Sequence, residues 1–283
     1  MNLFLTGAGG LLGRAVADVA AHRGHDVTAA DRAALDVTDP EAVRREIAAA
    51  APEVVVHCAA FTDVDGAEAE PERALRVNGE GTGNVAAACR TVGSLLVYPS
   101  TDYVFAGNAE RPWRTDDPAA PLGAYGRSKL AGEVAARARA PEHLVVRTSW
   151  LYGPGGRNFV DAVLARASRG EPLRVVADQT GRPTWTPSLA RTLLELVEAG
   201  ARGTVHATDG GSATWLELAK AALGGAGLEV PVVAVTSAEW GAAAPRPAYS
   251  VLDVGDTEAL IGHPLPHWRS SLARHLETTG ASR

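Results

Sequence analysis

Tyr125 and Lys129 are the residues of this sequence whose types and spacing most clearly permit catalysis. They form a Tyr-x-x-x-Lys pattern in the segment YGRSKLAGE, so on a helix they share one face. A tyrosine with a pKa of about 10 exchanges protons poorly near neutral pH. A nearby ammonium favours the phenolate, so we expect Lys129 to lower the pKa of Tyr125 and to speed proton transfer to a reduced carbonyl oxygen. A coincidental exposed Tyr–Lys pair is the alternative.

A candidate substrate-orienting hydroxyl lies at Thr101, in the segment STDY. Ser100 and Thr101 follow a predicted strand over residues 95–99, which would place Thr101 at the carboxyl edge of a sheet. From there its hydroxyl could bind a substrate carbonyl and the Tyr125 oxygen. Such a Ser/Thr pair alone more often caps a strand end. Its partnership with Tyr125 favours the catalytic role.

Three glycines, Gly7, Gly10 and Gly13, follow the first predicted strand and open the first predicted helix. Small residues there let the backbone approach a pyrophosphate, which the free N–H groups and positive dipole end of the helix attract. A purely structural glycine turn is the alternative. The preceding strand, the following helix and an acid at the end of the second strand favour a dinucleotide-binding site.

The acid is Asp31, whose carboxylate would accept hydrogen bonds from ribose hydroxyls and repel a 2′-phosphate, favouring NADH. Arg32 could instead pair with that phosphate, so both NADPH and NADH are plausible cofactors. Asp36 and Val37 follow in a position suited to flanking the adenine. A turn residue before the next helix is an equally good interpretation of Asp36.

The elements that would position these residues alternate along the first half of the chain. Buried parallel strands are predicted from apolar runs, and amphipathic helices lie between them. The predicted strands cover residues 2–6, 27–31, 54–58, 95–99 and 144–148, and the predicted helices cover residues 12–23, 40–50, 71–92 and 125–139. This alternation predicts the α/β class, with a doubly wound parallel (Rossmann) sheet.

We expect residues 1–153 to form the dinucleotide-binding domain and residues 154–283 to form mainly a smaller C-terminal substrate-binding region. Loops rich in glycine, proline and tryptophan begin after about residue 150 and mark the boundary between the two regions. Part of the second region, about 186–208, is expected to pack back on the sheet.

Composition excludes several other functions. The net charge of −6 and the lack of a basic run argue against a nucleic-acid partner. Cys58 and Cys89 are expected to be free thiols of a reducing compartment. No signal peptide and no apolar run long enough for a bilayer are found, which predicts a cytoplasmic protein without a membrane partner. His57 is expected to be a packed core residue, and neither a metal-site motif nor a Gly-x-Ser-x-Gly elbow is present.

The motifs together resemble the dTDP-4-dehydrorhamnose reductase family of extended short-chain dehydrogenases/reductases. The segments GAGGLLG, AAFTDVD, STDYVFAG, YGRSKLAGE, RTSWLYG, NFV, DQTGRPT and RPAYSVLD stand in the family's order between residue 7 and about residue 253. The resemblance implies NAD(P)H-dependent reduction of the C4 keto group of dTDP-4-dehydro-6-deoxy-L-mannose to dTDP-L-rhamnose, with Tyr125 as proton donor.

The resemblance also implies roles for individual residues. Those expected to hold the cofactor are Gly10, Leu11, Leu12, Asp31, Asp36, Val37, Ala60, Phe61, Thr62, Tyr125 and Lys129. Those expected to contact the sugar nucleotide are Thr101, Asp102 and Trp150, while Tyr103 and Asn158 lie in matching motifs, with aromatic packing and loop capping as alternatives.

Two positions depart from the family pattern. Ala15 stands where some members carry a glutamate that binds a dimer-bridging magnesium, so we expect no bound metal and, if a homodimer forms, no metal bridge. His57 stands where an asparagine is common, which suggests a divergent member acting on a related deoxysugar. The alternatives left open are a 4-ketoreductase or epimerase for another dTDP-deoxysugar of a specialised pathway and a non-catalytic cofactor-binding regulatory subunit.

Overall fold

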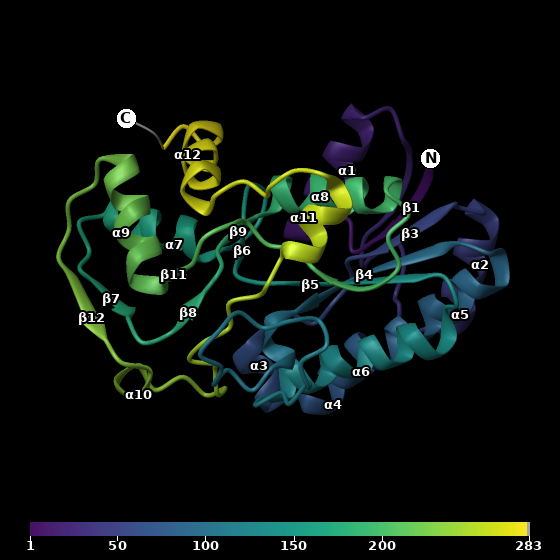
Figure 1. Cartoon of the computed structure of the whole chain (residues 1–283), viewed down its shortest axis with the longest axis horizontal. Coiled ribbons are helices and arrows are strands. Elements are labelled where there is room, and N and C mark those ends of the chain that lie inside the picture. Colours follow the sequence, from purple (N-terminus) through teal and green to yellow (C-terminus); the bar gives the residue numbers. More distant parts are fainter. Residues whose placement is uncertain (282–283) are drawn as a thin grey trace.

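The computed structural model describes residues 1–281, and its centre is a six-stranded parallel sheet (Figure 1). The strand order is β10–β5–β4–β3–β1–β2. These strands are β1 (Asn2–Thr6), β2 (Asp26–Ala30), β3 (Val54–His57), β4 (Leu95–Thr101), β5 (His143–Thr148) and β10 (Gly203–His206). The predicted doubly wound α/β fold is confirmed.

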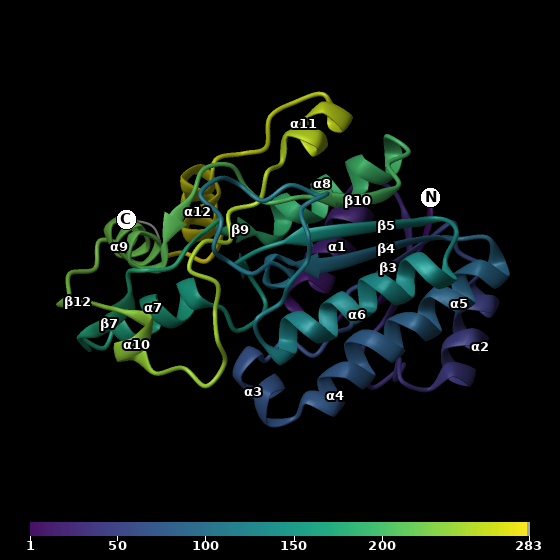
Figure 2. The same cartoon turned by 60° about the horizontal axis from the view of Figure 1, so that its bottom comes forward.

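Helices cover both faces of this sheet. Helices α1 (Leu11–His22) and α8 (Thr186–Glu198) pack on one face, and α2 (Pro40–Ala50), α5 (Thr82–Val92) and α6 (Ala124–Arg139) pack on the other. Figure 2 shows α5 and α6 side by side across the sheet. Because successive side chains of a strand point to opposite faces, Leu3 and Leu5 join one core and Phe4 joins the other.

The order of the strands creates a crevice beside β1. The chain goes from β1 to β2 on one side of it and then crosses back to place β3 on its other side. The connections above β1 and β3 therefore leave in opposite directions at the carboxyl edge. Ligands of such sheets bind at this switch point.

A smaller part of the molecule lies beyond the carboxyl edge, at the left of Figure 1. Its helices and short paired strands enclose two further apolar clusters. Its elements are β6 (Leu151–Tyr152), α7 (Phe159–Ala167), β7 (Leu173–Val176), β8 (Thr180–Gly181), β9 (Thr184–Trp185), β11 (Ala213–Thr214), α9 (Trp215–Ala226), β12 (Val232–Val235), α10 (Ser237–Trp240) and α12 (Trp268–Thr278).

Two elements from the second half of the chain belong to the central sheet layer. Helix α8 packs on α1, and β10 pairs with β5 as an edge strand. Helix α11 (Gly255–Ile261) packs against both of them. The division of the chain at residue 153 itself stays a prediction.

The predicted helix over residues 71–92 differs in the structure. It consists of α4 (Pro71–Leu75), a π-helical turn (Arg76–Gly81) and α5, and the short helix α3 (Val64–Ala69) precedes it. The wider turn carries Asn78, whose buried side chain accepts a hydrogen bond from Phe61 N at 2.8 Å and donates to Ser128 Oγ at 2.9 Å. A π-turn inserts one residue into a helix, often at a functional site. Here it ties the loop after β3 to α6.

The packing of α8 on the sheet can be tested by truncating a core leucine. Leu193 on α8 is 1% exposed among apolar side chains of α1 and the sheet, so Leu193→Ala removes buried surface and leaves a cavity. We expect it to lower the free energy of unfolding by about 2–5 kcal/mol, measured by urea denaturation. Leu260→Ala, at a 45% exposed position of α11, is the control and should cost at most about 0.5 kcal/mol. Equal losses in both variants would contradict this packing.

Candidate functional site

The turn after β1 brings three stretches of backbone into close contact. Gly7 has a φ of +67°, and a Cβ added to it would lie 2.4 Å from Ala59 N. A Cβ added to Gly13 would lie 2.2 Å from Gly7 O. Only glycine therefore permits this approach of α1 to the ends of β1 and β3. Gly10 precedes α1 without a side-chain cap, which leaves the first N–H groups of the helix free for an anion.

A cavity of ≈ 550 Å³ opens at the switch point between β1 and β3. Eight of the predicted cofactor residues line it, namely Gly7, Gly10, Asp31, Arg32, Asp36, Val37, Ala60 and Phe61. The other predicted cofactor residues, Leu11, Leu12, Gly13, Thr62, Tyr125 and Lys129, do not line it. The Leu12 side chain packs in the core beneath α1, so only its backbone could face a cofactor.

The two acidic residues of the cavity are partly engaged by their own loop. Asp31 Oδ1 accepts hydrogen bonds from Ala33 N at 2.9 Å and Ala34 N at 3.0 Å. Asp36 Oδ1 accepts from the backbone N and the hydroxyl of Thr38, and these bonds hold the pKa of Asp36 below its usual value. One oxygen of each carboxylate is thus fixed by the loop, and the other is left for a ligand.

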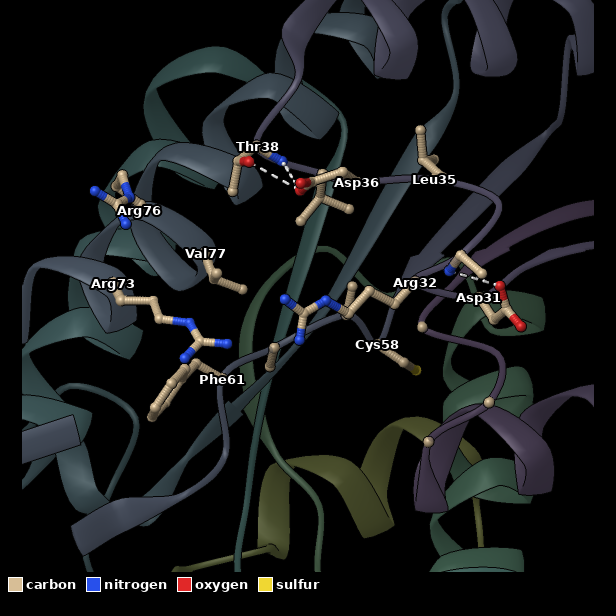
Figure 3. Close-up of a pocket in the computed structure, with 17 residues that line it drawn as sticks. Asp31, Arg32, Leu35, Asp36, Thr38, Cys58, Phe61, Arg73, Arg76 and Val77 are labelled. Atoms are coloured by element: carbon tan, nitrogen blue, oxygen red, sulfur yellow. Dashed lines mark hydrogen bonds between the residues drawn. The ribbon is translucent and has the colours of Figure 1, made fainter. Parts of the chain in front are cut away.

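Two further arginines of the cavity were not predicted. Arg73 from α4 and Arg76 from the π-helical turn line it beside Val77. The Arg73 guanidinium carbon lies 5.4 Å from the centre of the Phe61 ring. Figure 3 shows the guanidinium groups of Arg32 and Arg73 pointing toward one another across the cavity. No local motif marks these arginines, because α4 reaches the cavity only through the fold.

The predicted catalytic pair lies on α6, as its spacing requires. Lys129 is 3% exposed, and its Nζ donates to Pro99 O at 2.8 Å and lies 4.1 Å from the centre of the Tyr98 ring. Tyr125 is half-buried, and its ring meets that of Tyr103 edge-on at 5.8 Å.

The expectation that Lys129 lowers the pKa of Tyr125 is wrong in this structure. Burial and the nearby Asp102 carboxylate raise the pKa of Tyr125 to about 12, although the Thr101 side chain acts in the opposite direction. The physical reason is that the ammonium is directed at the Pro99 carbonyl and the Tyr98 ring. Burial also lowers the pKa of Lys129 to about 7, against the opposing charge of Glu133. The phenol therefore holds its proton at neutral pH.

The segment from Thr101 to Tyr103 lies where β4 ends. The strand extends to Thr101, two residues further than predicted, and Thr101 Oγ1 donates to Asp102 Oδ1 at 3.0 Å. Asp102 is 1% exposed, and burial raises its pKa to about 7 although the side chains of Ser250 and Thr101 lower it. Asp102 is thus placed to orient the Thr101 hydroxyl.

The other predicted substrate residues lie in the loop and helix that follow β5. Trp150 has a φ of +49° and stacks on Trp215 with ring centres 3.6 Å apart. A strained backbone at a non-glycine residue is typical of functional sites. Asn158 caps α7 by accepting from Asp161 N at 3.0 Å, and it donates to Gly153 O at 2.9 Å. Its polar atoms are committed to the loop, which supports loop capping over substrate contact.

The remaining expectations concern the core. His57 is 1% exposed, stacks on Tyr98 and shares a 2.7 Å hydrogen bond with Thr6, and burial lowers its pKa to about 3. Its prediction as a packed core residue is confirmed. Cys58 and Cys89 are free thiols, as expected.

Over residues 1–281, no group of three or more His, Cys, Asp or Glu side chains is arranged to hold a metal ion. No described helix is both long and apolar enough to cross a membrane.

Comparison with known proteins gives consistent similarities. Residues 1–280 match the family model of the RmlD substrate binding domain. A dTDP-4-dehydrorhamnose reductase of Streptomyces griseus is 45% identical over 95% of this chain and 90% of its own length. A probable dTDP-4,6-dihydroxy-2-methyloxan-3-one 4-ketoreductase of Streptomyces antibioticus is 42% identical over 96% of this chain and 93% of its own length. The crystal structure of dTDP-4-dehydrorhamnose reductase from Bacillus anthracis in complex with NADP has a TM-score of 0.94 and 37% identity, and 98% of each chain is covered.

The close approach at the glycine turn generates a binding prediction. Gly13→Ala introduces a methyl group against Gly7 O, so α1 must move away from the turn. We expect the affinity for NADPH, measured by calorimetric titration without substrate, to fall about tenfold or more. Gly224→Ala is the matched control, because nothing lies within 4 Å of the added Cβ on helix α9. Unchanged affinity in Gly13→Ala would show that the turn does not bind the dinucleotide.

Proposed function

Because the chain belongs to the RmlD substrate binding domain family, we propose that it is an NAD(P)H-dependent reductase of the C4 keto group of dTDP-4-dehydro-6-deoxy-L-mannose, with dTDP-L-rhamnose as product. The observation that carries the proposal is the arrangement of α6 against the end of β4. Tyr125 and Lys129 lie there beside Thr101, at the same sheet edge as the cavity above β1 and β3. The relatives named as dTDP-4-dehydrorhamnose reductases support the choice of sugar.

The residues at the switch point fit a dinucleotide. The free N–H groups at the start of α1 suit a pyrophosphate, and Asp31 retains one carboxylate oxygen for a ribose hydroxyl. A cavity of ≈ 550 Å³ lies within the range of small-molecule sites. When bound, the reduced nicotinamide supplies the hydride.

The chain's own residues would handle the proton. A sugar carbonyl reduced at C4 becomes an alkoxide, a much stronger base than a phenolate. The Tyr125 hydroxyl, which keeps its proton at neutral pH, can therefore donate it to that oxygen. The Thr101 hydroxyl donates to Asp102 in this structure, and it would turn its proton to the same substrate oxygen to fix that oxygen's position. Lys129 would stabilise the phenolate left on Tyr125 once its ammonium faces that oxygen.

A specific relative supports a second candidate. The probable 4-ketoreductase of Streptomyces antibioticus is nearly as similar to this chain as the reductase of Streptomyces griseus, which supports reduction of another dTDP-deoxysugar on the same scaffold. The site residues on α6 and β4 would serve both reactions equally. Proton NMR of the product would separate the two through the configuration at C4. A possible homodimer without a metal bridge and the cytoplasmic location stay predictions.

The main test removes the proton donor. Purified protein should oxidise NADPH only when a dTDP-4-keto-6-deoxyhexose is supplied, and Tyr125→Phe should lower kcat/KM by about 10²-fold or more. Dinucleotide affinity should change little in this variant. Tyr152→Phe is the control, because that buried hydroxyl contacts the Trp268 carbonyl at 3.4 Å rather than α6.

Two outcomes would contradict the proposal. Full turnover by Tyr125→Phe would exclude Tyr125 as the acid. Tight NADPH binding without oxidation against any 4-keto sugar nucleotide would favour a non-catalytic cofactor-binding subunit.

The cavity arginines predict a preference between the two dinucleotides. The guanidinium groups of Arg32 and Arg73 point toward one another across the cavity, and Arg73 also pairs with Glu70 at 3.0 Å. A 2′-phosphate bound between the two guanidinium groups would contact both cations. We expect Arg73→Ala to weaken NADPH binding about tenfold and to leave NADH binding within about twofold. Arg90→Ala on α5, an exposed arginine outside the cavity, controls for the lost charge. An equal loss for both dinucleotides would show that Arg73 does not read the 2′-phosphate.

A further inference from the structure

Glu133 is a fully buried carboxylate one helical turn beyond Lys129 on α6. Tyr125, Lys129 and Glu133 follow one another at intervals of four residues, so all three lie along one face of the helix. Glu133 is 0% exposed. The glutamate stands in the YGRSKLAGE segment, yet the proposed reaction assigns it no part.

The carboxylate is fully used by hydrogen bonds. Its Oε1 accepts from Ser100 Oγ at 2.7 Å and from Arg147 Nε at 2.9 Å. Its Oε2 accepts from Arg147 Nη2 at 2.8 Å and from Arg137 Nη2 at 2.7 Å. Arg147 is itself 4% exposed, so this bidentate pair is fixed in place away from water.

These bonds reach the catalytic end of β4. Ser100 lies between Pro99, whose carbonyl receives the Lys129 ammonium, and Thr101, the predicted substrate-orienting residue. Across the strand pair, Ser100 is in register with Arg147, and Thr101 with Thr148. Glu133 therefore fixes the strand residue that joins the contacts of Lys129 to the position of Thr101.

The charges around Lys129 make this carboxylate important for the amine as well. Lys129 and Arg147 are both buried, and Glu133 pairs with Arg147 at 2.8 Å and is the largest opposing charge that acts on Lys129. The other groups facing the amine supply no negative charge near neutral pH. They are His57 and Cys58 at the end of β3, with a pKa of about 3 and about 12, and Tyr98 on β4, whose pKa is raised by burial.

We propose that Glu133 is a positioning residue of the catalytic site, which favours the protonated form of the buried Lys129 amine and holds the Pro99–Thr101 end of β4 in place for proton transfer. The inference rests on the proposed reductase function for its catalytic consequence. Its electrostatic part concerns the free protein alone. Burial lowers the pKa of the amine, and the opposing charge of Glu133 is the largest influence that raises it.

A direct test is possible because the chain has only two lysines, Lys129 and Lys220. Protein with isotope-labelled lysine should give two resolvable side-chain NMR signals, and their pH titrations can be followed without substrate. Glu133→Gln keeps the shape of the side chain and removes its charge, so the pH midpoint of the Lys129 titration should fall by about one unit or more. In Glu133→Asp, which keeps the charge, it should stay within a few tenths of a pH unit of the wild type. Lys220, exposed on α9, is the internal reference.

The activity profile gives the second readout. If turnover needs the ammonium, the decline of kcat at rising pH should begin about one unit lower in Glu133→Gln, and KM for the sugar nucleotide should change little. Glu133→Asp should restore the profile at a lower plateau, because its shorter side chain holds Ser100 less closely. An unchanged Lys129 titration in Glu133→Gln would overturn the proposal, even if the variant were less stable.

A second variant decides the matter if Glu133→Gln does not fold. The half-exposed Arg137 pairs with Glu133 and offsets part of its negative charge. Arg137→Gln should therefore raise the pH midpoint of the Lys129 titration by a few tenths of a pH unit. No shift, or a downward shift, would count against the proposal. Failure of the proposed function is distinguishable, since an inactive protein with the predicted Lys129 titrations would contradict the reaction and leave the electrostatic role of Glu133 intact.

Discussion

The hydrogen bond from the buried Lys129 ammonium to the Pro99 carbonyl is the contact on which the candidate catalytic site depends. A lysine that is 3% exposed must exchange its hydration for protein partners, or it loses its charge. The carbonyl, the face of Tyr98 and the charge of Glu133 supply that replacement. In doing so they fix α6 against β4, which brings the hydroxyls of Tyr125 and Thr101 to the same edge of the sheet.

The second constraint is the close approach of backbone at the switch point. Gly7 and Gly13 leave no room for a Cβ, so α1 starts directly above the crevice between β1 and β3. The crevice is the proposed cofactor site, because the strands on either side of it continue into connections that diverge. The π-helical turn around Asn78 then ties the loop after β3 to Ser128 of α6. One buried amide thus joins the proposed cofactor cavity to the proposed catalytic helix.

The electrostatic balance of the site differs from the simplest expectation for a Tyr-x-x-x-Lys pair. Burial raises the pKa of Tyr125 and lowers that of Lys129, so each favours its neutral form. A neutral phenol suits a reductase, since the acid must hold its proton until the carbonyl becomes an alkoxide. In the same surroundings, the charge of Glu133 acts against burial and favours the ammonium form of Lys129. This effect gives a physical reason for a buried ion network directly behind the catalytic helix.

The sequence by itself determined five strands of the sheet, the glycine turn and the Tyr–Lys face of α6, because these depend on local periodicity and on spacing along one element. The end of β4 at Thr101 and the π-helical turn escaped prediction, since long-range contacts from Glu133, Ser128 and Phe61 stabilise them. Only the tertiary structure decided that Arg73 faces Arg32 and that Asn158 caps a helix. It alone decided the sign of the Tyr125 pKa shift, because desolvation and charge depend on neighbours distant in the chain.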